Sequence, residues 1–126
     1  MHPIERLRYV ARAGDAPAAP LVREAASALA TFAHDPTELL TACRQLVERR
    51  PTCGPLLWVA ARMLTGIDPH TEARDAIEAL ERDRTPDELA HALPADATVL
   101  VIGAAEASSA AVLQRPDVRV LVADTV

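Results

Sequence analysis

Residues 49–58 constrain the fold of this chain more than any other stretch. Pro51 lacks a backbone N–H and disfavours the helical conformation at Arg50, so a helix that arrives from the N-terminal side is predicted to end there. Thr52 is placed to cap a second helix, and Pro55 falls in its first turn, where a proline costs no intrahelical hydrogen bond. The segment therefore predicts a sharp corner between two helices.

This corner has the chemistry of an anion site. The start of a helix presents backbone N–H groups and a partial positive charge, and two arginines stand just ahead of it. We expect Arg50 to contact a phosphate and Thr52 to orient the helix N-terminus. The alternative is a tight helix–helix corner that binds no ligand.

Apolar residues recur at helical spacing on both sides of the corner. Capping residues followed by proline mark further helix starts, with Asp35 and Thr85 as the predicted N-caps and Gly66 as a predicted C-cap. The helix over residues 69–84 carries many charges outside a narrow apolar seam, which is typical of a face that contacts solvent. Residues 1–93 are thus predicted to form a helical N-terminal bundle.

The periodicity changes after residue 93. Thr98–Ile102 and Val118–Ala123 are continuous β-branched and aliphatic runs, as expected for strands that are buried on both faces, and residues 104–113 between them read as a helix. Residues 94–126 are therefore predicted to be the first β-α-β unit of a Rossmann-like domain, and the whole chain to be mostly α with a C-terminal α/β start. Two strands alone leave an apolar edge, which favours a fragment of a longer protein or a homo-oligomer.

The segment Arg50-Pro51-Thr52, followed by small residues and then Leu56 and Trp58, resembles the Arg-Pro-Thr segment of the translation initiation factor 2B alpha/beta/delta family. That family includes the isomerases of methylthioribose-1-phosphate and ribose-1,5-bisphosphate. The order of helices and strands in this chain is also similar to the family's helical domain and the start of its doubly wound domain. The resemblance implies an initiation-factor-2B-like protein that binds, or isomerises, a phosphorylated pentose near Arg50.

The resemblance does not extend to catalytic residues. The catalytic cysteine of the isomerases follows the first strand, where this chain has Ala104, and Cys53 in the corner is not its equivalent. The family's second strand ends in an acidic residue, a hydroxyl residue and an arginine, a pattern that Asp124 and Thr125 fit but Val126 does not. The catalytic aspartate would lie beyond residue 126. We therefore expect no isomerase activity from these residues alone.

Two other interpretations stay open. One is a non-catalytic oligomerisation or assembly subunit, which the missing cysteine favours. The other is a dinucleotide-binding unit, because Gly103 follows one strand and Asp124 ends the next, although Ala105 replaces the second glycine of the fingerprint. Ser108 and Ser109 lie in the first turns of the intervening helix and are further candidates for contacting an anion. No bound cofactor is expected.

Composition and charge argue against several classes of protein. The net charge is −5, and the 13 basic residues, all of them arginine, are interspersed with 18 acidic ones, so no face for nucleic acid is expected. The first residues lack the pattern of a signal peptide and no apolar run is long enough to span a membrane, so we expect a cytoplasmic protein whose two cysteines are small buried thiols. The four histidines lack the spacing of metal ligands.

Overall fold

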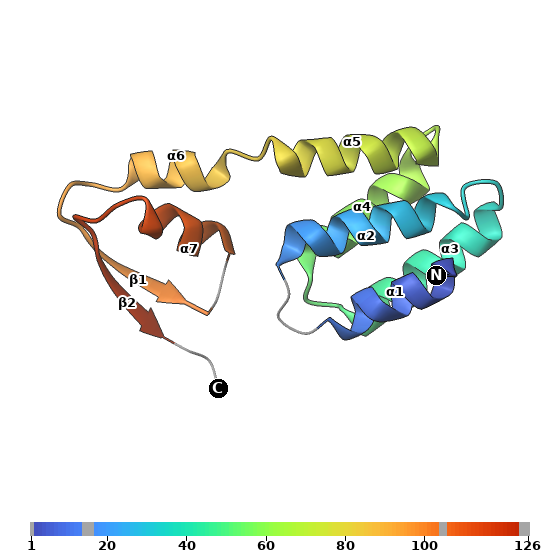
Figure 1. Cartoon of the computed structure of the whole chain (residues 1–126), viewed down its shortest axis with the longest axis horizontal. Coiled ribbons are helices and arrows are strands. Elements are labelled where there is room, and N and C mark those ends of the chain that lie inside the picture. The colour runs from blue at the N-terminus through green and yellow to red at the C-terminus, as the bar shows by residue number, and fades with distance from the viewer. Residues whose placement is uncertain (1, 14–16, 104–105, 124–126) are drawn as a thin grey trace. The chain divides into compact units, whose positions relative to one another are not determined.

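The computed structural model of the chain describes residues 2–13, 17–103 and 106–123, which are mostly helical with one small parallel sheet (Figure 1). None of the described helices is long and apolar enough to cross a membrane. The elements follow in the order α1 (Pro3–Arg12), α2 (Ala18–Ala30), α3 (Pro36–Arg49), α4 (Gly54–Thr65), α5 (Pro69–Glu81), α6 (Thr85–Ala92), β1 (Thr98–Ile102), α7 (Glu106–Leu113) and β2 (Arg119–Ala123).

The chain divides into two compact units, Met1–Arg82 and Asp83–Val126. The sequence predicts a domain boundary after residue 93, at the change from helical to strand-like periodicity. In the structure the second unit begins earlier in the sequence, at Asp83, because α6 packs against α7 and therefore belongs with the strands. Periodicity alone cannot assign a helix to one unit or the other, since that depends on which neighbour it packs against.

The first unit is built around α2, which packs against α1, α4 and α5, while α3 packs against α4 (Figure 1). Alanines on α2 keep these helices close, and Ala25, Ala26 and Ala28 are fully buried. Each larger apolar side chain removed from water contributes about 1.5–3 kcal/mol. The largest fully buried side chains come from α1 to α4: Leu29, Leu46, Leu56, Met63, Val10, Val22, Val59 and Cys43.

Aspartates fix the starts of two helices in this unit. Asp35 accepts hydrogen bonds from the N–H groups of Thr37 at 2.8 Å and Glu38 at 3.1 Å, so the predicted cap of α3 is confirmed. Asp68 caps α5 in the same way. In both helices a proline follows the cap, at a position where no intrahelical N–H is needed.

The predicted cap of α6 is wrong. Thr85 is the first residue of that helix, and Asp83 accepts hydrogen bonds from its N–H at 2.9 Å and from its hydroxyl at 2.6 Å. The carboxylate two residues earlier therefore takes the acceptor role that the sequence assigns to the threonine. These bonds, led by the one from the Thr85 hydroxyl, lower the pKa of Asp83.

The charged surface of α5 makes contacts with neighbouring helices. Glu72 accepts a hydrogen bond from Arg62 of α4 at 2.8 Å, and Glu81 forms an ion pair with Arg23 of α2. Ion pairs at this level of exposure contribute only about 0–1 kcal/mol each. The charged surface of α5 is thus partly exposed, as predicted, and also forms ion pairs with α2 and α4.

In the second unit, β1 and β2 pair in parallel, with Thr98 opposite Arg119 and Ile102 opposite Ala123. The β-α-β order is as predicted, and the bounds of β1 agree with the sequence. The expected burial on both faces is wrong. Val101 is the one buried residue of β1, and every residue of β2 is exposed. A parallel sheet is buried when helices cover both of its faces, and the described residues do not supply that cover.

Candidate functional site

The helix–helix corner lies where the sequence predicts it. Arg50 is the C-cap of α3, with φ −134° and ψ 59°, values outside the helical region. Its N–H still donates to the carbonyl oxygens of Leu46 and Val47, each at 3.2 Å. Pro51 follows and has no N–H with which to continue the ladder. The break in the helix is thus a direct consequence of the proline.

The role of Thr52 differs from the expectation. Cys53, and not Thr52, is the N-cap of α4, and no side chain accepts a hydrogen bond from the first amides of that helix. The N–H groups of Leu56 and Leu57 donate to the carbonyl oxygen of Cys53, each at 3.1 Å. Thr52 stands one residue before the cap and its side chain is exposed. The hydroxyl is therefore free of a capping role.

Gly54 supplies the open backbone donor of this turn. Pro55 has no N–H and the next two amides are already bonded, whereas the N–H of Gly54 has no hydrogen-bond partner among the described residues. A Cβ atom built on Gly54 would meet nothing within 4 Å, so this backbone is open to approach. The sequence predicts several backbone N–H groups without partners here, whereas in the structure only that of Gly54, among the described residues in the first turn of α4, lacks one.

Arg50 is half-buried and already takes part in an interaction within the chain. An incoming anion would have to share its guanidinium, which has five N–H donors. The corner thus combines a cationic side chain, one backbone donor and one exposed hydroxyl, from Arg50, Gly54 and Thr52. This set can bind a phosphate group, and it contains no group that could transfer a proton.

The remaining predicted residues belong to the second unit. Gly103 follows β1 with φ +75°, a left-handed conformation that favours glycine, and its N–H donates to the carbonyl oxygen of Ala123 at 3.0 Å. Ser108 is half-buried and Ser109 exposed, both in the first turn of α7. Asp124 lies outside the described residues. Arg50 and Thr52 are in the first unit, so the structure describes these two sets of residues separately.

Sequence reasoning missed a charged cluster within the second unit. The guanidinium of Arg115 donates to the carbonyl oxygens of Ala90 and Leu93, each at 2.7 Å, and of Pro94 at 3.2 Å. It also donates to the carboxylate of Asp117 at 2.7 and 2.9 Å. Helix C-termini leave carbonyl oxygens unpaired, and Arg115 pairs those at the end of α6. Nothing in the spacing of these residues predicts the contact.

Asp117 extends the cluster to the loop before β1. Its carboxylate accepts a hydrogen bond from the N–H of Asp96 at 3.1 Å, and Asp96 has φ +56°. The bond from Arg115, followed by the bond from this amide, holds the pKa of Asp117 well below its usual range. The same ion pair raises the pKa of Arg115. Because Arg115 already donates to five acceptor atoms, the cluster is structural.

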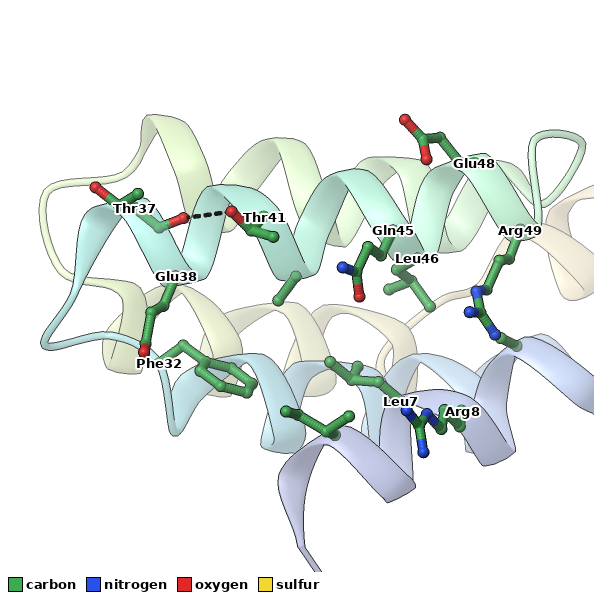
Figure 2. Close-up of a pocket in the computed structure, with 13 residues that line it drawn as sticks. Leu7, Arg8, Phe32, Thr37, Glu38, Thr41, Gln45, Leu46, Glu48 and Arg49 are labelled. Carbon is green, nitrogen blue, oxygen red and sulfur yellow. Dashed lines mark hydrogen bonds between the residues drawn. The ribbon is translucent and has the colours of Figure 1, made fainter.

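A groove of about 500 Å³ opens in the first unit between α1 and α3 (Figure 2). It exists because α1 packs mainly against α2 and has few contacts with α3. Its apolar wall is formed by Ile4, Leu7, Ala11, Phe32, Ala42 and Leu46. Polar and charged residues complete the lining: Arg8, Thr37, Glu38, Thr41, Gln45, Glu48 and Arg49. Sequence reasoning missed this groove, because a gap between two helices depends on how both pack against a third.

The cysteines are free thiols. Cys43 is fully buried against the core, and burial raises the pKa of its thiol to about 11, so the prediction of an inert buried thiol is confirmed for this residue. Cys53 is only half-buried. Within the described residues, no group of three His, Cys, Asp or Glu side chains could hold a metal ion.

The initiation factor 2B resemblance stays a prediction from the sequence. A comparison of the chain with protein-family models finds no match, and a comparison with curated proteins also finds none.

Proposed function

We propose that this chain is an initiation-factor-2B-like protein that binds a phosphorylated small molecule, with a phosphorylated pentose as the first candidate. In this proposal the first unit is the helical domain, and the second unit is the opening β-α-β of a Rossmann-like domain. Support comes from the order of the elements, helices followed by parallel strands. The observation that carries the proposal is the corner Arg50-Pro51-Thr52, where the broken α3 meets the uncapped start of α4.

Three donors in the corner suit a phosphate group. The guanidinium of Arg50 supplies a positive charge and planar hydrogen-bonding geometry. The open N–H of Gly54 lies at the N-terminus of α4, where the helix dipole favours an anion. The exposed hydroxyl of Thr52 is the third donor. Gly103, Ser108 and Ser109, together with Asp124, would contribute to binding from the α/β part of the protein.

The proposal concerns binding and assigns no catalytic residue. An aldose–ketose isomerase needs a pair of groups that transfer protons at the sugar carbons. The donors in the corner hold a phosphate but do not perform that transfer. A protein with the corner alone would therefore act as a sensor of a sugar phosphate, and isomerase activity would require residues from outside the corner.

Thermal unfolding in the presence of ribose 5-phosphate tests this function. A ligand at a hundred times its Kd stabilises a protein by about 2.7 kcal/mol. We expect the phosphate ester to raise the Tm of the wild-type chain and of Arg44→Ala, a change at an exposed arginine of α3 outside the corner. We expect Arg50→Ala to abolish the shift, and ribose to give none in any variant. Equal shifts in Arg50→Ala and wild type would rule the corner out.

Isotope-edited NMR locates the binding in the same experiment. The amide resonance of Gly54 is expected to move with increasing ribose 5-phosphate, because its N–H is the open backbone donor of the turn. The amides of Leu56 and Leu57 already donate within the chain and are expected to move less. Changes confined to other helices would contradict the assignment even if the Tm rises.

A second candidate function is assembly with another copy of the chain. It is favoured by apolar residues that the sheet leaves uncovered, since Leu100 is 59 % exposed, Leu121 53 % and Val122 68 %. Leu100 and Leu121 are register partners and therefore lie on the same face. If this face joins two copies, Leu121→Glu will shift sedimentation toward the monomer, and Leu113→Glu, a change at an exposed leucine of α7, will not. A wild-type monomer at all concentrations would exclude assembly.

A further inference from the structure

The groove between α1 and α3 has the size and lining of a small-molecule site. Its volume of about 500 Å³ lies within the range of roughly 300–1,000 Å³ that is typical of ligand pockets. The bottom of the groove is formed by core residues, since Leu46 is 2 % exposed and Ala42 is 8 % exposed. Leu7 and Phe32 are half-buried and pack against the same core, so they offer apolar surface that is still accessible.

One end of the groove carries two positive charges. Arg8 from α1 and Arg49 from α3 both line this end of the groove (Figure 2). Neither forms a hydrogen bond or an ion pair with any residue that the structure describes. Several other arginines of this unit do form ion pairs, for example Arg6 with Glu24 and Arg62 with Glu72. The two guanidinium groups are therefore available to an anion in the groove.

The carboxylates that line the groove do not neutralise this end. Glu48 belongs to the lining, but its carboxylate points away from α1 (Figure 2). Glu38 lies at the other end, in the first turn of α3, near Phe32. Arg49 lies eleven positions after Glu38, which is about 16.5 Å along the helix axis at 1.5 Å per residue. The groove thus has a positive end, an apolar middle and a negative end.

We propose that this groove binds an amphipathic monoanion, a small molecule with a carboxylate at one end of an aliphatic body. The carboxylate lies between Arg8 and Arg49, each of which can offer it paired N–H donors. The aliphatic body lies along the apolar wall toward Phe32. Glu38 disfavours a second negative charge at the far end, so the site selects monoanions over dianions. This site is distinct from the corner of Arg50 and Thr52, neither of which lines the groove.

Titration with decanoate, followed by calorimetry and by amide NMR shifts, tests the proposal. The wild-type chain is expected to bind decanoate saturably, with shifts concentrated in α1 and α3. The double variant Arg8→Ala/Arg49→Ala is expected to raise the Kd by roughly tenfold, since two exposed charge pairs are lost. Arg44→Ala, at an exposed arginine of α3 that does not line the groove, is expected to leave the Kd unchanged. All three arginines are exposed, so these variants retain the fold.

Two further ligands separate the contributions of the head and of the far end. Decanol has the same body without the charge and is expected to bind more weakly than decanoate. Decanedioate places a second carboxylate toward Glu38 and is also expected to bind more weakly, with Glu38→Gln reducing the difference. Arg50→Ala is expected to leave decanoate binding unchanged. The ribose 5-phosphate test of the corner and the decanoate test of the groove can therefore fail independently.

Several results would overturn the inference. These are the absence of saturable decanoate binding, an unchanged Kd in the double arginine variant, and decanol binding as tightly as decanoate. Shifts confined to the second unit would also overturn it, because the groove lies in the first. A preference for decanedioate would overturn the selection for monoanions.

Discussion

The two units of this chain bury their apolar residues to very different extents. In the first, helices surround α2, and Leu29 and Leu56 are completely removed from solvent. In the second, both strands are as apolar as any helix of the first unit, yet Leu100 and Val122 remain 59 % and 68 % exposed. An apolar segment becomes part of a core only when another element covers it, so apolar sequence is a necessary condition for burial and not a sufficient one.

The two units also differ in the interactions that hold them together. Burial of apolar side chains dominates in the first unit, where the larger core residues are Leu, Val and Met. In the second, Arg115 joins the end of α6 to Asp117, and Asp117 joins the loop before β1. Few residues of the second unit are buried, and this polar cluster connects its parts.

The largest expected effect comes from a cavity in the first unit. Leu29→Ala should lower the free energy of unfolding by about 2–5 kcal/mol, because the side chain is fully buried and its removal leaves a cavity in the core. The matched change in the second unit is Leu121→Ala, where the side chain is 53 % exposed and the loss should stay within about 0.5 kcal/mol. Urea unfolding measures both. Equal losses would mean that β2 is covered in solution, for instance by a second copy.

The next effect concerns the polar cluster of the second unit. Arg115→Ala removes donors from three carbonyl oxygens and from Asp117, so the amides of β1 and β2 should exchange with deuterium faster than in the wild type. The amides of α2 should be unaffected. Arg119→Ala, at an exposed arginine of the same unit, serves as control. Unchanged protection of the strands in Arg115→Ala would show that the ladder between β1 and β2 is stable without the cluster.

A smaller effect tests the two capping assignments in the first unit. Asp35→Ala removes the acceptor for two amides and should cost about 0.5–2 kcal/mol. Thr52→Ala should change the free energy of unfolding very little, because Cys53 is the N-cap of α4. Chemical denaturation of both variants measures the difference. A comparable loss in Thr52→Ala would restore the threonine as a cap.

The smallest effect depends on pH. The folded-state pKa of Asp117 is lowered, so its stabilising contribution is complete above the usual aspartate pKa of about 4 and is lost as the pH falls through the lower folded-state value. In the first unit, Arg6 lowers the pKa of Glu24 in the same way, but the apolar core does not titrate. Amide NMR spectra recorded from pH 6 down to pH 2 should therefore show the second unit losing structure first. In Asp117→Asn this loss of structure at low pH should no longer occur first in the second unit. If it still does, the protonation of another carboxylate causes it.

Local chemistry explains why some of these features could be predicted. Asp35 followed by a proline specifies a helix start within three residues, and Pro51 ends a helix by removing one N–H and restricting one neighbour. The same kind of pattern misplaced the caps at Thr52 and Thr85, because a shift of one residue moves a hydroxyl away from the amides that need it. Rules of this kind are therefore accurate for the existence of a helix and less so for its first residue.

The two candidate sites also differ in whether adjacent or distant residues form them. The corner at Arg50 follows from adjacent residues, so the sequence was sufficient to locate it. The groove was not predictable, because Arg8 and Arg49 are far apart in the sequence and line the same groove only where α1 and α3 both pack beside α2. The contacts of Arg115 with the end of α6 have the same origin, since they join residues more than 20 positions apart.

The sequence by itself determined the elements: where helices break, which segments are strands, and the positions of the prolines and aspartates that begin the helices. These depend on interactions between neighbours in the chain, which periodicity and capping chemistry describe. Only the tertiary structure decided which apolar faces are covered, which arginines keep no partner among the described residues, and which unit includes α6. Those properties depend on contacts between distant segments, whose energies no local pattern contains.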